Sequence, residues 1–348
     1  MERSGFLVDG GALARFGADL SDTIDRLEQR IYAAAGQQFN INSPKQLGKV
    51  LFEDLGLPHG KKTKTGWSTN ADVLEKLKDH PLVADVLTYR QYAKLKSTYA
   101  DGLLKVIDPD GRIRTSFQMT VTATGRLSST EPNLQNIPTR TELGSKMRGM
   151  FVAAPGHVLV DADYSQIELR LLAHISGDTA MQQAFLSGED FHTVTAARVF
   201  HVPQDQVTHQ MRSRAKAVNF GIVYGISAFS LSQDIGVTVQ EAKEYMDRYF
   251  ATYTGVKQYM TDVVDKAREQ GYVETLWHRR RALPELKSSN FNMRSFGERV
   301  ALNMPIQGTA ADIIKLAMVR VHSRLAREGL AARLIMQVHD ELIVECPE

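Results

Sequence analysis

Cysteine is almost absent from this chain, because Cys346 is the single one among 348 residues. One cysteine excludes a disulfide within the chain and a zinc site built from cysteine ligands. The sequence also lacks a secretory apolar region near its start and an apolar run long enough to span a membrane. Internal repeats and low-complexity linkers are missing as well. These absences predict a globular, cytoplasmic protein with no membrane contact.

A large excess of charge of one sign is also lacking. The formal net charge is +2, and 43% hydrophobic with 24% charged residues is an ordinary globular composition. A polyanionic partner would therefore have to be bound by local groups of cations. Such groups occur at Lys61 to Lys64, Arg140 to Arg148 and Arg279 to Arg281. Each group alone is more often a solvated surface.

The most informative segment is Arg212 to Gly225. Residues four apart on an α-helix differ by only about 40° around the axis. One stripe therefore carries Arg212, Lys216, Phe220 and Tyr224. Cations bind phosphates through charge-assisted hydrogen bonds, and flat rings stack on sugars and bases. The stripe predicts a nucleotide-binding face, although a solvated basic edge beside a core edge gives the same pattern.

Acidic residues stand where an apolar run ends. Val158 to Val160 predicts a short buried strand, which leads directly into Asp161 and Asp163. A carboxylate at such a strand end lies where the chain leaves the core. For Asp161 a solvated strand end is the preferred interpretation, whereas Asp163 is a candidate for chemistry.

A second apolar segment, Leu334 to Val344, is interrupted by His339, Asp340 and Glu341. Three consecutive ionisable residues between apolar runs predict a hairpin turn, or a strand whose polar centre needs a partner. Carboxylates from separate strands can converge on a hard cation, and magnesium prefers oxygen ligands. Asp340 is therefore the second candidate metal ligand.

Three segments occur in a fixed order, namely Asp163 to Arg170, Arg212 to Gly225 and Val338 to Glu341. In this order they resemble the three polymerase motifs of family A DNA polymerases. The likeness extends over three further segments: Thr122 to Ser129, Asn133 to Pro138 and Gln307 to Asp312. It covers nearly the whole chain, and several long ordered motifs are far more specific than one short pattern. The sequence thus resembles the polymerase domain of this family, of the bacterial type.

The resemblance implies a mixed α/β (α+β) chain with the right-hand polymerase fold of thumb, palm with an antiparallel sheet, and helical fingers. The expected segments are residues 1–105 for the thumb and N-terminal part of the palm, 106–175 for the first part of the palm, 176–284 for the fingers, and 285–348 for the second part of the palm. Because the chain begins at Met1 and ends at Glu348, we expect no exonuclease activity and a palm that is incomplete at the C-terminus.

Periodicity along the chain is consistent with this division. Helical patterns occupy Leu20 to Ala35 and Asn70 to Leu104, on either side of a basic loop, His59 to Gly66. Short strands and loops are predicted from Lys105 to Ile175. Helices are then predicted from Asp190 to about Glu274, followed by strands near the end.

The resemblance also implies the reaction, which is template-directed DNA synthesis. A primer 3′ hydroxyl attacks the α-phosphate of a deoxynucleoside triphosphate, and pyrophosphate leaves. The implied cofactor is two Mg²⁺ ions held by Asp163, Tyr164 and Asp340, with Glu341 as a supporting acid and Lys216 as a catalytic cation. Phosphoryl transfer requires mainly positioning and charge neutralisation, so no side-chain nucleophile is needed. The expected partners are primer-template DNA and deoxynucleoside triphosphates, bound by a monomer.

For the triphosphate, the resemblance implies a set of residues on the fingers and palm: Arg212, Lys216, Phe220, Tyr224, His192, Gln166 and Glu168. Phe220 corresponds to the ring against the nucleotide sugar, and Tyr224 to the fingers-hinge residue on the template side. His192 follows Glu189 and Asp190, a predicted helix start. Without the resemblance it would be interpreted as a surface histidine.

For DNA, the resemblance implies a larger set: Arg126, Asn133, Gln135, Asn136, Arg90, Lys94, Arg299, Asn303, Gln307 and His339. Acceptors in the minor groove vary little between base pairs, so contacts there can test pair geometry without reading sequence. Amides in the loop Thr130 to Pro138 would otherwise satisfy the local backbone.

Glu168 has two interpretations. Ser165 to Glu168 fits a capping box that would start the helix Leu169 to Ile175. The resemblance instead makes Glu168 a steric gate that fills the space of a ribose 2′ hydroxyl, and we expect the gate.

Two alternative functions remain open. A single-subunit RNA polymerase shares the two aspartates and the Lys and Tyr-Gly helix, but Glu168 and the loop Thr124 to Arg126 favour a DNA product. A catalytically impaired fragment that only binds primer-template DNA is the other alternative, because the chain stops soon after the Asp340 hairpin.

Overall fold

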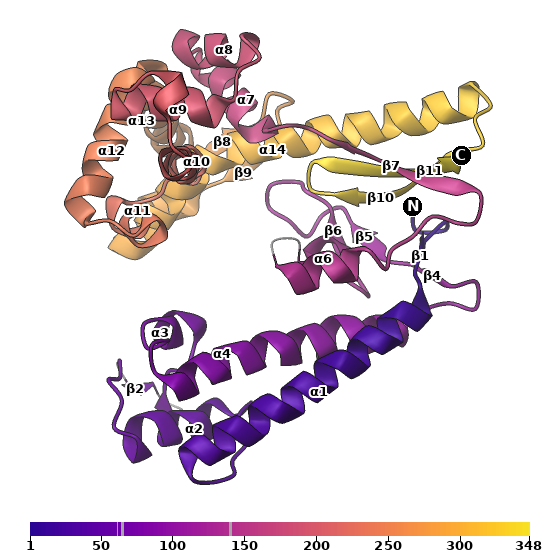
Figure 1. Cartoon of the computed structure of the whole chain (residues 1–348). Coiled ribbons are helices and arrows are strands. Elements are labelled where there is room, and N and C mark those ends of the chain that lie inside the picture. The colour runs from indigo at the N-terminus through magenta and orange to yellow at the C-terminus, as the bar shows by residue number, and fades with distance from the viewer. Residues whose placement is uncertain (61, 64–65, 139–140) are drawn as a thin grey trace. The chain divides into compact units, whose positions relative to one another are not determined.

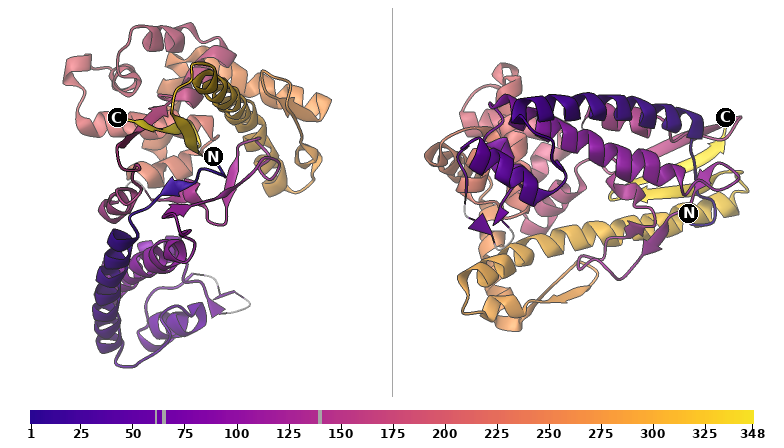
Figure 2. Two further views of the ribbon diagram at one scale, coloured as in Figure 1. Left: turned by 90° about the vertical axis from the view of Figure 1, so that its right-hand side faces the viewer. Right: turned by 90° about the horizontal axis from the view of Figure 1, so that it is seen from below.

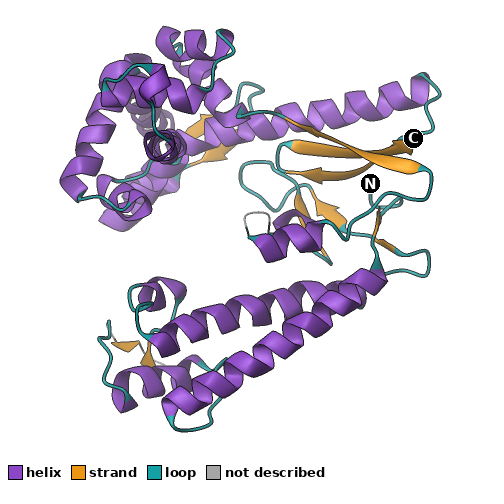
Figure 3. Ribbon diagram, in the orientation of Figure 1, coloured by secondary structure: helices purple, strands orange, loops and turns teal. Residues whose placement is uncertain are grey.

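The computed structural model describes residues 1–60, 62–63, 66–138 and 141–348. The chain divides into two compact units. Unit 1 comprises Met1–Ser116, Ser129–Leu159 and Glu345–Glu348, and unit 2 comprises Phe117–Ser128 and Val160–Val344. Helices and short strands occur in both units (Figure 3).

Unit 1 is built around a pair of helices. α1 (Gly10–Ala35) and α4 (Pro81–Lys94) lie side by side in all views (Figure 1, Figure 2). α1 begins after Asp9, whose carboxylate accepts the Ala12 backbone N–H at 2.8 Å. It ends at Gly36, whose φ of 67° favours glycine. The apolar stripes of both helices contribute to one core, which includes Leu27, Ile31, Leu82, Val83 and Val86.

The remaining helices of unit 1 are short: α2 (Pro44–Gly48), η1 (Lys49–Asp54), α3 (Ala71–Glu75), η2 (Leu95–Ala100), α5 (Asp101–Leu104), η3 (Leu134–Asn136) and α6 (Glu142–Arg148). The predicted helical pattern from Asn70 to Leu104 is thus confirmed, as successive segments. Short antiparallel pairs complete the unit, with β1 (Phe6–Leu7) on β4 (Arg112–Ile113) and β2 (Lys62–Thr63) on β3 (Gly66–Trp67).

A buried ion pair ties the C-terminal residues into unit 1. Arg112 on β4 donates to both carboxylate oxygens of Glu345, at 2.9 and 2.8 Å. Glu345 also accepts the Ala154 backbone N–H at 3.0 Å, and Arg112 donates to the Gly5 carbonyl at 3.1 Å. Because both charged groups are hydrogen-bonded, their burial is tolerated.

Most helices of unit 2 form one cluster: α7 (Ile167–Ser176), α8 (Thr179–Leu186), α9 (Phe191–Phe200), η4 (Gln204–Gln206), α10 (His209–Val223), α11 (Ala228–Ile235), α12 (Val239–Thr252) and α13 (Thr254–Gln270). The apolar faces of the α-helices among them enclose one core that includes Leu172, Phe191, Val218, Ile222, Tyr249 and Tyr253. The expectation of a helical region from Asp190 is confirmed. Its predicted start was too late, because α8 precedes it, whereas α7 matches the helix expected over Leu169 to Ile175.

A 37-residue helix, α14 (Phe291–Arg327), follows the hairpin β8 (Tyr272–Glu274) and β9 (Arg280–Ala282) and the turn η5 (Pro284–Lys287). Strands were expected after Glu274, and this helix was not predicted from the sequence. Pro305 lies inside it, where a proline removes one helical hydrogen bond. The buried side chains around Pro305 outweigh that loss: Ala301, Met304, Ile306 and Ala310.

The remaining strands form a three-stranded sheet in the order β10-β11-β7, from β7 (His157–Asp163), β10 (Arg333–Val338) and β11 (Glu341–Pro347). The predicted hairpin turn is confirmed between β10 and β11, where His339 has φ 52°. The prediction of a buried strand at Val158 to Val160 was wrong in one respect. β7 is at the edge of the sheet, and Val158 and Val160 are 38% and 49% exposed. A further short pair, β5 (Ser116–Gln118) and β6 (Ser128–Thr130), follows β4 along the chain.

The mixed helix-and-sheet fold class is therefore confirmed. No helix within the described ranges has both the length and the apolar character needed to cross a bilayer.

Candidate active site

The basic and aromatic stripe lies on α10, whose first turn is capped by Thr208 through the Met211 backbone N–H. Lys216 is exposed and Phe220 is half-buried. The His192 ring from α9 lies beside Phe220, with 5.7 Å between ring centroids. The predicted helix start at Asp190 is confirmed, but the surface interpretation of His192 is wrong, because its side chain is only 3% exposed.

The orientation of the His192 ring is fixed by Asn219. The amide Nδ2 of Asn219 lies 3.0 Å from His192 Nδ1. Since an amide nitrogen can only donate, Nδ1 is the acceptor and the ring proton is on Nε2. Burial lowers the pKa of His192 to about 4, and the Arg212 and Lys216 charges act in the same direction while Asp190 opposes them. The neutral imidazole is therefore an N–H donor at neutral pH.

Glu168 lies at the centre of a second group. Arg126 donates to Glu168 Oε1, and the Tyr224 hydroxyl donates to Oε2 at 3.0 Å. The capping-box interpretation of Glu168 is wrong. Gln166, the residue before α7, has the left-handed φ of 54° and makes no side-chain cap bond. The carboxylate is instead directed to Arg126 and Tyr224.

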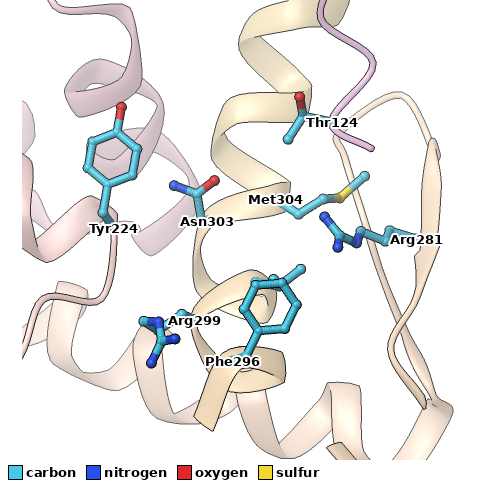
Figure 4. Close-up of a pocket in the computed structure, with 8 residues that line it drawn as sticks. Thr124, Tyr224, Arg281, Phe296, Arg299, Asn303 and Met304 are labelled. Carbon is cyan, nitrogen blue, oxygen red and sulfur yellow. The ribbon is translucent and has the colours of Figure 1, made fainter. Parts of the chain in front are cut away.

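Tyr224, at the C-terminal end of α10, borders a small cavity of about 160 Å³ (Figure 4). Burial, followed by the Glu168 charge, raises the pKa of the Tyr224 hydroxyl, which therefore stays protonated, and the side chain of Gln307 also bonds it. Asn303 contributes a long contact of 3.5 Å to the Val223 carbonyl. The cavity is lined by Thr124, Tyr224, Arg281, Phe296, Arg299, Val300, Asn303 and Met304. It therefore combines aromatic rings with guanidinium groups.

The predicted metal ligands Asp163 and Asp340 are brought to the same end of the sheet. Asp163 is the last residue of β7, and Asp340 lies in the turn between β10 and β11. The backbone N–H of Tyr164 donates to the Asp340 carbonyl at 3.1 Å, which joins these two segments. Glu341 begins β11 directly after Asp340, while His339 is exposed on the turn.

Electrostatics at this place favour a cation. Reduced hydration, and then the carboxylates of Asp340 and Asp161, raise the pKa of Asp163. Within the described ranges, no group of three or more His, Cys, Asp or Glu side chains is positioned to hold a metal. Two carboxylates are nevertheless sufficient for magnesium, which retains waters and binds substrate phosphates. The oxygen donors and the excess negative charge therefore fit a divalent cation.

The other predicted DNA-binding residues lie in unit 1. The Arg90 guanidinium is half-buried against Thr69, where it donates to the carbonyl and to the hydroxyl, while Lys94 on α4 is exposed. In the loop, Asn133 and Gln135 accept backbone N–H groups, and Asn136 is exposed. The loop amides thus also satisfy the backbone, as the simpler interpretation predicted.

All three predicted basic groups are partly neutralised within the protein, since Lys62 of the first group pairs with Glu53 at 3.9 Å. Arg279 donates through two nitrogens to Asp312, and Arg280 pairs with Glu274 and lies over the Tyr272 ring. In the group from Arg140 to Arg148, Lys146 pairs with Glu142. Lys61, Lys64 and Arg140 lie outside the described residues.

Comparison with known proteins decides the family. The sequence profile of DNA polymerase family A matches residues 11–348. The chain belongs to DNA polymerase family A. Among family A relatives, it is 57% identical over its whole length to DNA polymerase I of Geobacillus stearothermophilus and to DNA polymerase I of Bacillus subtilis (strain 168). It spans about 40% of the length of each of these relatives.

A solved structure agrees in fold. It is described as the POL domain of Pol1 from M. smegmatis in complex with DNA primer-template and dNTP. The two are 49% identical with a TM-score of 0.94, over 99% of this chain and 61% of that one.

Several residues of the site were not predicted from the sequence. Asp190 and Asn219 stand beside predicted residues, and Phe296 lines the cavity. Asp190 was predicted only as a helix start. Its ion pair with Arg212 depends on the packing of α9 against α10. A sequence pattern does not show that packing.

Proposed function

We propose that the chain catalyses template-directed DNA synthesis, adding deoxynucleotides from dNTPs to a primer 3′ hydroxyl with release of pyrophosphate. The observation that carries the proposal is the arrangement of side chains in unit 2 of this family A chain. Asp163 lies close enough to Asp340 for their charges to interact, and His192 lies beside Phe220 of the stripe on α10. Cations for phosphates and carboxylates for metals are the two components that phosphoryl transfer requires.

Asp163 and Asp340 would hold two Mg²⁺ ions, with Tyr164 as a further ligand and Glu341 as a supporting acid. When bound, the ions would supply activation of the primer hydroxyl and neutralisation of the charge that develops on the phosphates. Asp163 and Asp340 place negative charge at the turn beside β7 without offering a nucleophile.

Arg212, Lys216 and His192 would bind the triphosphate. Lys216 is an exposed point charge, and Nε2–H of neutral His192 is a directed donor to a phosphate oxygen. Phe220, half-buried beside His192, would lie against the sugar. Gln166 and Glu168 would flank the nucleotide, with Glu168 as the gate against a 2′ hydroxyl.

The partner would be primer-template DNA. The Glu168 carboxylate is bound by Arg126 and by the Tyr224 hydroxyl, and the side chain of Gln307 bonds that hydroxyl in turn. We assign DNA contacts to two groups of residues: Arg126, Arg299, Asn303, Gln307 and His339 in unit 2, and Arg90, Lys94, Asn133, Gln135 and Asn136 in unit 1. Phosphate contacts among them would make affinity strongly salt-dependent.

In domain terms, we assign residues 1–105 to the thumb and the N-terminal part of the palm, 106–175 to the first part of the palm, 176–284 to the fingers and 285–348 to the second part of the palm. We further propose that the chain acts as a monomer in the cytoplasm.

Primer extension with Mg²⁺ and either dNTPs or rNTPs tests the proposal. Extension that depends on template, metal and dNTPs is expected. Preferential use of rNTPs would identify an RNA polymerase instead. Salt-sensitive binding of the duplex without any extension would identify an impaired DNA-binding fragment.

A further inference from the structure

Asp190 and Arg212 form a two-point ion pair between α9 and α10. Arg212 Nε donates to Asp190 Oδ1 at 3.0 Å, and Nη2 donates to Oδ2 at 2.8 Å. The carboxylate is itself fixed, because Oδ1 accepts both the backbone N–H and the hydroxyl of Thr193, each at 2.8 Å. Asp190 therefore acts at once as the N-cap of α9 and as a fixed partner for Arg212.

This pairing leaves the other edge of the guanidinium available. A guanidinium has five N–H donors in a planar fork, and the edge formed by Nε and Nη2 is occupied by Asp190. Within the described parts of the chain, every hydrogen bond found for the Arg212 side chain goes to Asp190. The end of the fork, which includes Nη1, can thus still bind a phosphate through two parallel hydrogen bonds.

The same short segment also orients His192. Asp190 starts α9 two residues before His192, whose ring is held by Asn219 and lies beside Phe220. The Arg212 guanidinium raises the ionised population of Asp190 further, because it holds the pKa of this carboxyl well below its usual range. The carboxylate is therefore a permanent anion at any pH where a polymerase works.

We propose that Asp190 is a positioning residue of the triphosphate site, which holds the side edge of Arg212 so that the free end of its guanidinium faces the terminal phosphates of a nucleoside triphosphate. The inference rests on the proposed function and adds to it a residue that does not itself touch the nucleotide. A fixed anion beside a phosphate site could instead compete with the phosphates for Arg212. The two roles predict opposite changes in triphosphate affinity.

The test uses Asp190→Asn and Asp190→Ser. Asn and Ser are both favoured N-caps, so each keeps an oxygen for the Thr193 N–H while removing the charge that holds Arg212. In primer extension, the KM for dNTP is expected to rise about tenfold, the lower end of what loss of an orienting partner costs at a metal site. The kcat should stay within about threefold of the parent, because the lost interaction serves binding.

Equilibrium binding supplies a readout that needs no catalysis. The probe is dATP, titrated into the chain with a primer-template whose primer ends in a dideoxynucleotide. The Kd should rise by about the same factor as the KM. A parent that binds dATP in this Asp190-dependent way but never extends a primer would overturn the proposed function and leave the positioning role standing.

Two controls separate positioning from helix capping. Thr208→Ala removes the N-cap of α10, the helix that carries Arg212, and should lower the Tm without changing the KM. In an Arg212→Ala background, Asp190→Asn should change the KM less than about twofold, because the two residues act as one unit.

Three results would overturn the inference. An unchanged Kd and KM in both Asp190 variants would leave Asp190 as a helix cap alone. A lowered Kd would make it a competitor of the phosphates. A tenfold rise of the KM caused by Asp190→Asn in the Arg212→Ala background would mean that Asp190 does not act through Arg212.

Discussion

Glu168 is held at both of its carboxylate oxygens, by Arg126 and by the Tyr224 hydroxyl. The sequence pattern Ser165 to Glu168 suggested a helix cap, and the structure excludes it because Gln166 makes no side-chain cap bond. The side chain is only 10% exposed, so its volume is as constrained as its charge. These two properties can be separated by mutation.

Glu168→Ala should raise the efficiency of ribonucleotide incorporation relative to deoxynucleotide by about ten- to a hundredfold, because an emptied pocket rejects an added hydroxyl poorly. It should also cost about 1–3 kcal/mol of the free energy of unfolding, since Arg126 and Tyr224 lose their partner. Glu168→Gln keeps the volume and should keep the sugar preference. If the ratio of ribonucleotide to deoxynucleotide incorporation in Glu168→Ala equals that of the parent, Glu168 is not the gate.

His192 differs from an ordinary surface histidine because burial lowers its pKa to about 4. In the unfolded chain the pKa is close to the usual value of about 6.5. Between these values the unfolded state binds the proton and the folded state does not. The stability contributed by neutral His192 is therefore fully present above about pH 6.5 and is lost as the pH falls towards 4.

His192→Gln should accordingly lose less stability than the parent between pH 7 and pH 5, as measured by urea unfolding at both values. Gln can still accept the Asn219 amide N–H, which limits the effect of the mutation at pH 7. His174→Gln at an exposed position of α7 is the matched control and should keep the parental difference. A His192→Gln profile parallel to that of the parent would mean that this histidine does not set the pH response.

At the scale of elements, Asp178 joins two helices that are far apart in sequence. It is the N-cap of α8, and Oδ1 accepts the Met181 N–H at 2.9 Å. Its other oxygen accepts the backbone N–H groups of Gly255 and Val256 at the start of α13, at 2.8 and 3.4 Å. Glycine is needed for this approach, because a Cβ on Gly255 would lie 2.9 Å from Asp178 Cα. One carboxylate therefore serves two helix N-termini.

Asp178→Ala should cost about 2–4 kcal/mol of the free energy of unfolding, because buried N–H groups of both helices lose a charged acceptor. Thr238→Ala, at the exposed N-cap of α12 in the same unit, should cost only about 1 kcal/mol. Urea unfolding of both variants makes the comparison. Equal losses would mean that the contact with α13 contributes nothing.

The difference between local patterns and contacts among distant elements explains which elements were predictable. α10 and the turn at His339 and Asp340 follow from local periodicity and turn chemistry, and both were predicted correctly. α14 was missed because Pro305 interrupts a helical pattern whose stability comes from burial on other elements. The exposure of β7 was missed because edge position in a sheet depends on strand order and not on local composition.

At the scale of the whole molecule, the candidate site draws on segments from almost the full length of unit 2. The motif order in the sequence selected Asp163, Arg212, Lys216, Phe220 and Asp340, since each lies in a long contiguous pattern. Asp190 and Asn219 could not be selected, because their importance comes from contacts between α9 and α10. Predicted from sequence alone, the site therefore contained the proposed substrate-binding residues but not those that hold them in place.

We propose above all that Asp163 and Asp340 together provide the metal-binding carboxylates of a DNA polymerase. The most direct measurement is Mg²⁺-dependent primer extension by Asp163→Asn and Asp340→Asn, with primer-template affinity measured in parallel. Asp161→Asn, an exposed carboxylate on the same strand, is the matched control. Each of the two variants should lose about a thousandfold or more in extension rate while binding DNA within a few-fold of the parent, and the control should extend normally. Extension by either variant within a few-fold of the parent would contradict the account.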